Sequence, residues 1–183
     1  MDVETTAIAD VKIFTPPVFS DSRGYFTETY TQNKFAPHAQ GLEFVQDNES
    51  FSVEPFTVRG LHYQSPPFAQ DKLVRVLSGV IFDVAVDVRA ASPSFGQWVG
   101  VELSAENHKQ LLVPAGFLHG FMTLTADTLV AYKVTSFYDK ASDGAVHFAS
   151  KGLAIDWPAP IEKAILSDKD AAAPDFSEFT SPF

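Results

Sequence analysis

Three side chains able to bind an anion or move a proton lie close together in the chain. Arg59 and His62 belong to the segment Val58–Gln64, and Lys72 follows shortly after. Imidazole exchanges protons near neutral pH, so His62 is a candidate general acid or base. The neighbouring residues are typical of a buried strand, and cations are hard to bury without an anionic partner such as a phosphate or a developing oxyanion. The segment therefore predicts an anion-binding or proton-transfer site.

A simpler interpretation of His62 stays open, because a lone histidine in a strand commonly satisfies its ring with a backbone carbonyl. Strand geometry adds a constraint. Alternate residues of a strand face opposite sides of a sheet, so Arg59 and His62 point apart in a regular strand. Both can reach one cavity only if Gly60 permits a bulge or a twist.

Two residues much further along the chain could take part in the same chemistry. Tyr132 lies in the apolar run Leu129–Val134, where it is either a core aromatic or a phenol able to donate a proton. Asp170 lies in a polar stretch that by itself is typical of a solvated turn. If the C-terminal segment folds back, its carboxylate can fix the tautomer of His62 and raise the basicity of the ring.

The elements that must position these residues are almost entirely β-strands. From Lys72 to Arg89, apolar and polar residues alternate in two runs separated by Ser78 and Gly79, which predicts a β-hairpin with one buried face. Helical periodicity is confined to 31–39 and 159–164. Further strands, separated by turn residues, are expected over 41–52, 97–103, 110–113, 120–124 and 129–137. This pattern predicts an all-β barrel or jelly roll in one domain, 1–183, with a few short peripheral helices.

Jelly rolls of the cupin type usually carry a metal site made of two histidines and a glutamate on one hairpin and a third histidine further on. The second half of this pattern is present, because Pro114 and Gly116 predict a turn before His119. The first half is absent, since Gln64 stands in place of the second histidine and Lys72 in place of the glutamate. An ammonium where a carboxylate is needed repels a divalent ion, so we expect no catalytic metal.

Composition excludes several function classes. The 183 residues include no cysteine, which rules out disulfides, cysteine-zinc sites and thiol catalysis and makes the cytoplasm the expected location. The formal net charge of −10 disfavours binding to nucleic acid. No apolar run approaches the ~20 residues of a membrane span, and no apolar run follows a basic start. Neither a membrane anchor nor a cleaved signal is therefore expected.

A series of motifs from about Val11 to Asp170 resembles the dTDP-4-dehydrorhamnose 3,5-epimerase family, in the same order and at similar spacings. These motifs are Asp21-x-Arg23-Gly24-x-Phe26-x-Glu28, Gln46-Asp47-Asn48-x-Ser50, Arg59-Gly60-Leu61-His62-Tyr63-Gln64, Gln70-x-Lys72, Asp87-Val88-Arg89, Pro114-x-Gly116-Phe117-x-His119-Gly120-Phe121, Tyr132 and Ser167-x-Lys169-Asp170. One such motif is weak evidence, whereas eight in register are specific. The chain departs from the family at 147–150, where Trp-Asn-Asp-Pro is usual, and at Asp143, where a longer glutamate is usual.

The resemblance implies a cupin-type jelly roll and a reaction. The family substrate, dTDP-4-dehydro-6-deoxyglucose, has a ketone at C4, so the hydrogens on C3 and C5 can be removed as protons and no redox cofactor is needed. By resemblance, His62 is the base, held by Asp170, and Tyr132 returns a proton to the opposite face of the sugar. Lys72 is expected to stabilise the enolate oxygen as its charge develops.

The same resemblance implies the contacts to the nucleotide sugar. They fall on Arg23 and Arg59 for the diphosphate, His119 for the sugar, Glu28, Gln46 and Asn48 toward the thymidine, Tyr138 as a stacking partner of the base, and Phe26, Asp143 and Lys169 as further substrate-binding residues. Family members are homodimers in which an N-terminal strand joins the partner's sheet, and the β-prone residues 9–14 are compatible with that.

Two alternatives remain open. Relatives that epimerise only C3 or only C5 share almost all these motifs. A non-catalytic sugar-nucleotide-binding jelly roll would keep the fold and the anion contacts. Such a binding module has no need for the four proton-transfer and charge-stabilising residues together, and all four are present: His62, Lys72, Tyr132 and Asp170.

Overall fold

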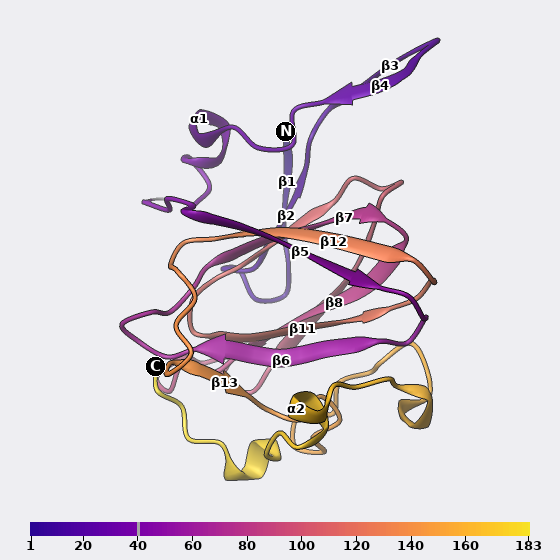
Figure 1. Cartoon of the computed structure of the whole chain (residues 1–183). Helices are drawn as coiled ribbons and strands as arrows, with labels where there is room; N and C mark the ends of the chain where they lie inside the picture. The colour runs from indigo at the N-terminus through magenta and orange to yellow at the C-terminus, as the bar shows by residue number, and fades with distance from the viewer. Residues whose placement is uncertain (40) are drawn as a thin grey trace.

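A computed structural model describes residues 1–39 and 41–183 as two facing β-sheets, a projecting hairpin and a few short helices (Figure 1). The larger sheet has six strands in the spatial order β1 (Asp2–Thr5), β2 (Lys12–Thr15), β10 (Gln110–Val113), β7 (Lys72–Ser78), β12 (Thr128–Val134) and β5 (Gln46–Ser52). The smaller sheet has five, in the order β13 (Asp143–Ala145), β6 (Val58–Gln64), β11 (Phe117–Thr123), β8 (Val80–Asp87) and β9 (Trp98–Ser104). The remaining elements are the hairpin of β3 (Val18–Asp21) and β4 (Gly24–Thr27), the α-helices α1 (Gln32–Phe35) and α2 (Asp168–Ala171), and the 3₁₀ helices η1 (Ile161–Lys163) and η2 (Phe176–Glu178).

An apolar core fills part of the space between the two sheets. Val74 and Val130 enter it from the larger sheet, and Ile81, Ala85 and Phe121 enter it from the smaller one. Alternate residues of a strand face one side of a sheet, and the contributing residues of β8, Ile81 and Ala85, are accordingly an even number of positions apart. Removal of this apolar surface from water is the main stabilising contribution to such a fold. The all-β jelly roll with short peripheral helices, predicted from the sequence, is confirmed.

A second apolar cluster covers the outer face of the smaller sheet. Val84 and Val86 of β8 pack there with Phe148, Leu153 and Trp157 of the C-terminal segment. In Figure 1 this segment, coloured orange to yellow, runs beneath β6 and places α2 against that strand. The C-terminal part of the chain is thereby held next to the middle of the sequence.

The predicted hairpin over Lys72–Arg89 is wrong. β7 pairs with β10 and β12, whereas β8 pairs with β11 and β9 in the other sheet. Gly79, with φ +81°, instead directs the chain from one sheet to the other. The predicted single buried face is also wrong, because Asp83 and Asp87 are fully buried on the face assigned to solvent. Alternation in the sequence shows which residues share a face of a strand, but it does not show the pairing partner or the segment that covers the other face.

The other predicted elements are present with different ends. β5 begins at Gln46 instead of 41, β11 begins at Phe117 instead of 120, and β12 ends at Val134 instead of 137. The predicted helix over 31–39 contains only α1 as helix, and the one over 159–164 contains only η1. Both helical stretches are too short to be stable alone, so packing decides their extent.

Candidate active site

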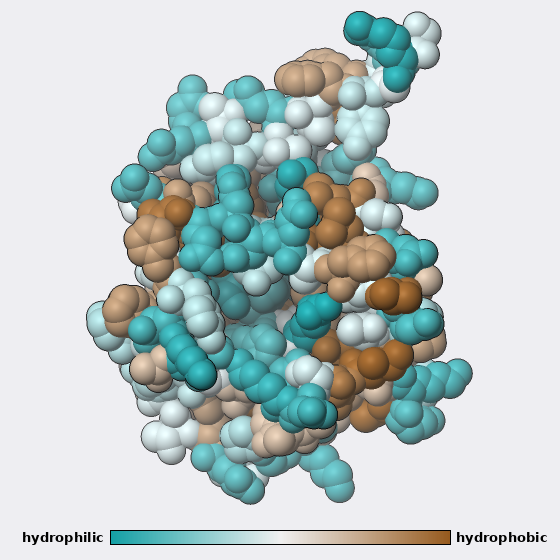
Figure 2. All heavy atoms as spheres, in the orientation of Figure 1, coloured by the Kyte–Doolittle hydropathy of each residue, from teal (hydrophilic) through white to brown (hydrophobic). Residues whose placement is uncertain are grey.

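The space between the sheets opens to the surface as a cavity with two adjoining chambers of about 390 Å³ and about 460 Å³. Four side chains line both chambers: His62, Lys72, Tyr132 and Lys169. Figure 2 shows hydrophilic side chains gathered at the centre of the face that carries β5 and β6. Three of the four predicted proton-transfer and charge-stabilising residues thus line both chambers, and the fourth, Asp170, lines the first.

A bulge in β6 brings Arg59 and His62 to the same cavity. On the neighbouring strand, His119 is opposite His62 and Phe121 is opposite Arg59, so β6 contains one more residue than β11 between these two pairs. Gly60 has φ +127°, which L side chains rarely adopt. The bulge that the sequence requires for a shared cavity is therefore present, and Arg59 and His62 both line the first chamber.

His62 forms a hydrogen-bonded pair with Asp170. Its Nε2 lies 2.5 Å from Oδ1 of the carboxylate, and Asp170 is only 4% exposed. Ser167 caps α2 by accepting the Asp170 backbone N–H at 3.1 Å, which fixes the helix that carries the carboxylate. Burial alone would raise the pKa of the Asp170 carboxyl, but hydrogen bonds from His62, Ser167 and the Gly60 backbone amide hold it below its usual range.

Lys72 begins β7 and directs a cation into the cavity. Burial lowers the pKa of its ammonium to about 8, while the charges of Asp83 and Asp143 act to raise it. Among the described residues, no hydrogen bond or ion pair to this ammonium is present. A partly desolvated cation without a protein partner can stabilise a developing negative charge on a substrate.

Tyr132 faces His62 from the opposite sheet. The tyrosine lies on β12 of the larger sheet and the histidine on β6 of the smaller one, and both line the same two chambers. Burial raises the pKa of the Tyr132 phenol above its ordinary value, with the charge of Arg59 acting in the other direction. The phenol thus remains protonated at neutral pH and can serve as a proton donor.

A second histidine–carboxylate pair lies beside the first. Nε2 of His119 is 2.7 Å from Oδ1 of Asp83, and both residues are buried. The sequence did not predict Asp83 as a site residue, because the alternation of apolar and polar residues over Lys72–Arg89 assigned it to a solvent-exposed face. The only available signal was a carboxylate inside a strongly apolar strand.

Residues predicted to contact the thymidine line the second chamber. Gln46 and Asn48 lie next to each other on the cavity side of β5, with Gln46 Nε2 donating to Asn48 Oδ1 at 2.8 Å. Tyr138, Asp143 and Lys169 also line this chamber; the Lys169 ammonium is 2.5 Å from the Asp143 carboxylate and the Tyr138 hydroxyl donates to it at 3.3 Å. The structure thus gathers five predicted substrate-binding residues around one opening.

Three predicted substrate-binding residues lie outside both chambers. Arg23 and Phe26 are on the projecting β3–β4 hairpin, where Arg23 pairs with Asp21 at 2.6 Å and Phe26 is 68% exposed (Figure 1). Glu28 follows β4 and pairs with Lys34 at 2.6 Å. Within one chain, these side chains are not brought together with His62.

Sequence comparison agrees with this geometry. A family model described as dTDP-4-dehydrorhamnose 3,5-epimerase matches residues 5–178. The chain belongs to this epimerase family. A dTDP-4-dehydrorhamnose 3,5-epimerase from Sinorhizobium fredii is 48% identical over 183 residues, which span 100% of this chain and 93% of that protein.

Solved structures of the epimerase family share the whole fold. A Legionella pneumophila dTDP-6-deoxy-D-glucose-3,5-epimerase in complex with dTDP-4-keto-L-rhamnose is 45% identical, with a TM-score of 0.93 over 98% of this chain and 94% of that one. A 3'-monoepimerase from Streptomyces bikiniensis in complex with dTDP-quinovose is 32% identical, with a TM-score of 0.88 over 95% and 87% of the two chains. The structural neighbours of this epimerase family are cupin-like jelly rolls.

In the part of the chain that the structure describes, no cluster of three or more histidine, aspartate or glutamate side chains is placed to hold a metal ion. No helix over residues 1–39 and 41–183 combines the length and the apolar character needed to cross a membrane.

Proposed function

We propose that this chain is a dTDP-4-dehydrorhamnose 3,5-epimerase that converts dTDP-4-dehydro-6-deoxyglucose into dTDP-4-dehydro-L-rhamnose in dTDP-L-rhamnose biosynthesis. The observation that supports this most strongly is the placement of a base and a proton donor on opposite walls of one cavity. His62, paired with Asp170 at 2.5 Å, lies on one sheet, and Tyr132 lies on the other. A sugar ring between them has one face toward each residue.

The chemistry follows from the C4 ketone of the substrate. His62 removes the proton on C3 or C5, because the resulting carbanion is delocalised onto the C4 oxygen as an enolate. Lys72 stabilises this oxygen, and the loss of one such donor typically costs about 3 kcal/mol of transition-state stabilisation. Tyr132 then delivers a proton to the opposite face of the same carbon, so its configuration inverts. Electrons stay within the sugar, so the reaction requires no redox cofactor.

The rest of the cavity fits the remainder of a nucleotide sugar. Arg59 lines the first chamber and offers a guanidinium to the diphosphate. The second chamber offers amides from Gln46 and Asn48 and an aromatic ring from Tyr138, groups suited to hydrogen-bond and stack on a pyrimidine. His119, buried beside His62, lies at the sugar end.

Incubation with the substrate in heavy water tests the proposal. Epimerisation at both carbons incorporates deuterium at C3 and C5, while incorporation at C3 alone identifies a monofunctional relative. No incorporation rejects the enzyme in favour of a non-catalytic nucleotide-sugar-binding protein. His62→Ala should abolish exchange and still bind dTDP. His38→Ala, a change at a histidine that lines neither chamber, should exchange like the wild type.

The homodimer is part of the same proposal. Arg23 and Phe26 lie on a hairpin that projects away from the chain's own cavity (Figure 1). A second copy that receives this hairpin would gain a cation and an aromatic ring for its nucleotide. The hairpin exposes large apolar side chains, including Phe19 at 61% and Tyr25 at 62%, which a partner surface would remove from water.

We further propose that the enzyme works in the cytoplasm and without a metal. The ammonium of Lys72 in the cavity supports the second point, because it opposes the binding of a divalent cation. Metal analysis of the purified, active protein tests it: stoichiometric iron, zinc or manganese that is required for turnover would refute a metal-free reaction.

A further inference from the structure

The side-chain amide of Gln64 is fully used by the protein. Gln64 lies on β6, two residues after His62, and is only 5% exposed. Its Nε2 donates to the carbonyl oxygens of Phe68 at 2.7 Å and Phe137 at 3.2 Å, and its Oε1 accepts the backbone N–H of Asp139 at 2.8 Å. Both amide hydrogens and the carbonyl oxygen are therefore occupied, so Gln64 has no free donor for a substrate.

Two of these three hydrogen bonds flank Tyr138. The amide holds the carbonyl of Phe137 on one side of Tyr138 and the N–H of Asp139 on the other. Tyr138 itself is 58% exposed, and among the described residues its backbone N–H and hydroxyl form only long hydrogen bonds of 3.3 Å, to Gln46 and Asp143. Apolar packing holds this ring weakly, so its orientation depends on the backbone on both sides.

Other hydrogen bonds hold the residues that precede Tyr138 in the chain. Thr135 bonds to Asp71, and the backbone carbonyl of Ser136 accepts from Gln70 at 2.8 Å. These contacts fix the start of the loop, while Gln64 fixes the peptide groups next to the ring. Gln64 and His62 lie on the same strand, so Gln64 fixes the position of the Tyr138 ring relative to His62.

The geometry points to Gln64 as a positioning residue that holds Tyr138 in place against the pyrimidine end of the nucleotide. This inference rests on the proposed function and extends it, because it assigns part of the nucleotide affinity to Gln64, a residue at the second chamber whose amide donors are both bonded to the protein. The three hydrogen bonds of the Gln64 side chain also require an amide. A carboxylate of the same shape keeps the acceptor for Asp139 but offers nothing to the carbonyls of Phe68 and Phe137.

The test is a double-mutant cycle measured by calorimetric titration with dTDP. Gln64→Leu should weaken dTDP binding about tenfold, the order of one base–aromatic stacking contact, with kcat within about threefold of wild type. In a Tyr138→Ala background the same change should have little further effect, because the ring that Gln64 positions is already gone. An equal loss in both backgrounds, or a large loss of kcat with unchanged dTDP affinity, would overturn the inference.

Two further variants keep the test decisive. Gln64→Glu should weaken dTDP binding by a similar factor, which covers the case that Gln64→Leu does not fold; unchanged affinity in this variant would also overturn the inference. Asn107→Leu is the matched control, since the Asn107 amide makes three hydrogen bonds to backbone groups of Glu102, Ser104 and Lys109 in a turn outside both chambers. It should leave dTDP affinity unchanged.

A wild-type chain that binds no dTDP refutes the proposed function, whereas wild-type binding with full affinity in the Gln64 variants refutes this inference alone.

Discussion

The carboxylate of Asp170 lies 2.5 Å from the imidazole of His62, although 108 positions separate the two residues in the chain. The C-terminal segment spans the outer face of the smaller sheet, and its helix α2 contacts β6. The proposed base, His62, thus has a carboxylate partner from a distant part of the chain.

Asp170→Asn tests this dependence. The amide keeps the shape of the side chain but removes the charge that orients the imidazole and stabilises its protonated form, so we expect turnover to fall about 100-fold. The KM for the nucleotide sugar should change little. The matched control is Asp168→Asn on the same short helix, where the side chain is exposed. Loss of activity in the control to the same extent would mean that α2, and not the carboxylate, is what the reaction needs.

Lys72 should impose an alkaline limit on catalysis. The ammonium stabilises the enolate only while it is protonated, and burial lowers its pKa to about 8. Activity should therefore decrease as pH rises through about 8, measured as the pH dependence of deuterium exchange. Burial raises the pKa of Tyr132 above its ordinary value of about 10, so the phenol does not account for a limit near 8.

Substitution of Lys72 tests whether its ammonium, and not another titrating group, sets the alkaline limit. Lys72→Arg keeps a cation that is charged throughout the accessible range, so the alkaline limit should move upward even if the rate is lower. Lys133→Met changes a lysine on the outer face of the same sheet, paired with Asp47 at 2.8 Å, and should leave the limit in place. An alkaline limit that stays near 8 in Lys72→Arg would assign it to another group.

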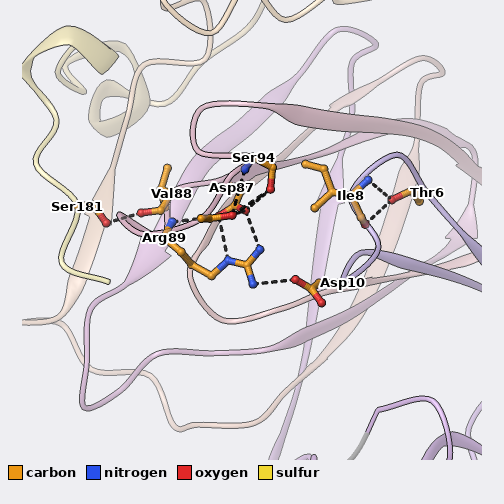
Figure 3. Close-up of polar contacts among 9 residues, drawn as sticks. Thr6, Ile8, Asp10, Asp87, Val88, Arg89, Ser94 and Ser181 are labelled. Atoms are coloured by element: carbon orange, nitrogen blue, oxygen red, sulfur yellow. Dashed lines mark hydrogen bonds and ion pairs between the residues drawn. The ribbon is translucent and has the colours of Figure 1, made fainter.

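Asp87 and Arg89 form an ion pair at the end of β8 (Figure 3). The carboxylate is fully buried and accepts from the Arg89 guanidinium at 2.7 and 2.9 Å and from the hydroxyls of Ser92 and Ser94 at 2.5 and 2.6 Å. Asp87→Asn should lower the free energy of unfolding by about 3 kcal/mol, because a fully buried site loses the negative charge that accepts hydrogen bonds from the partly exposed Arg89 guanidinium. Asp10→Asn removes the exposed partner of Arg89 and should cost less than about 1 kcal/mol. Urea unfolding measures both.

The same pair predicts a pH dependence of stability. Burial alone would raise the pKa of Asp87, but hydrogen bonds from Arg89, Ser92 and Ser94 hold it well below its ordinary value. A carboxyl whose pKa is lower in the folded state stabilises the fold above its unfolded pKa of about 3.9, and this contribution is lost as pH falls toward the folded value. The difference in stability between wild type and Asp87→Asn should therefore be constant above about pH 5 and shrink in more acidic solution. A difference that grows on acidification would contradict the assignment.

Gly60 is required for the bulge that brings Arg59 and His62 to one cavity. A Cβ at this position would lie 2.6 Å from the Cα of Gly120 and 2.7 Å from the carbonyl oxygen of His119. With φ at +127° as well, Gly60→Ala should destabilise the protein by about 3 kcal/mol and abolish activity, as measured by thermal unfolding and deuterium exchange. Gly152→Ala meets nothing closer than 3.5 Å and should change stability by less than about 1 kcal/mol. An active, stable Gly60→Ala protein would show that the bulge is dispensable.

Mixed dimers can reveal whether Arg23 serves the partner's site. Arg23→Ala and His62→Ala should each be inactive alone. Random reassembly of an equal mixture places both native residues in one of the two sites of each heterodimer, so activity should return to about a quarter of the wild-type value. A mixture as inactive as its components would mean that Arg23 acts within its own chain or that the chain is not a dimer.

The sequence by itself determined the kind of chemistry and the fold class. An imidazole, an ammonium and a phenol in β-prone segments predicted proton transfer beside an anion, because protonation and charge are properties of the side chains. Period-two alternation predicted strands for a local reason, since it follows from the pleat. The sequence also predicted that Arg59 and His62 share a cavity only if the strand bulges or twists at Gly60, because a regular strand places them on opposite faces.

The tertiary structure decided which of these residues meet. It separated β7 from β8, buried Asp83 and Asp87, paired Asp83 with His119 and left Arg23 on a hairpin outside its own cavity. None of these outcomes is encoded in a local pattern, because each depends on which distant segment covers a face of a strand. The contact of Asp170 with His62 is of the same kind, because only the packing of the C-terminal segment over the sheet brings this carboxylate to the imidazole.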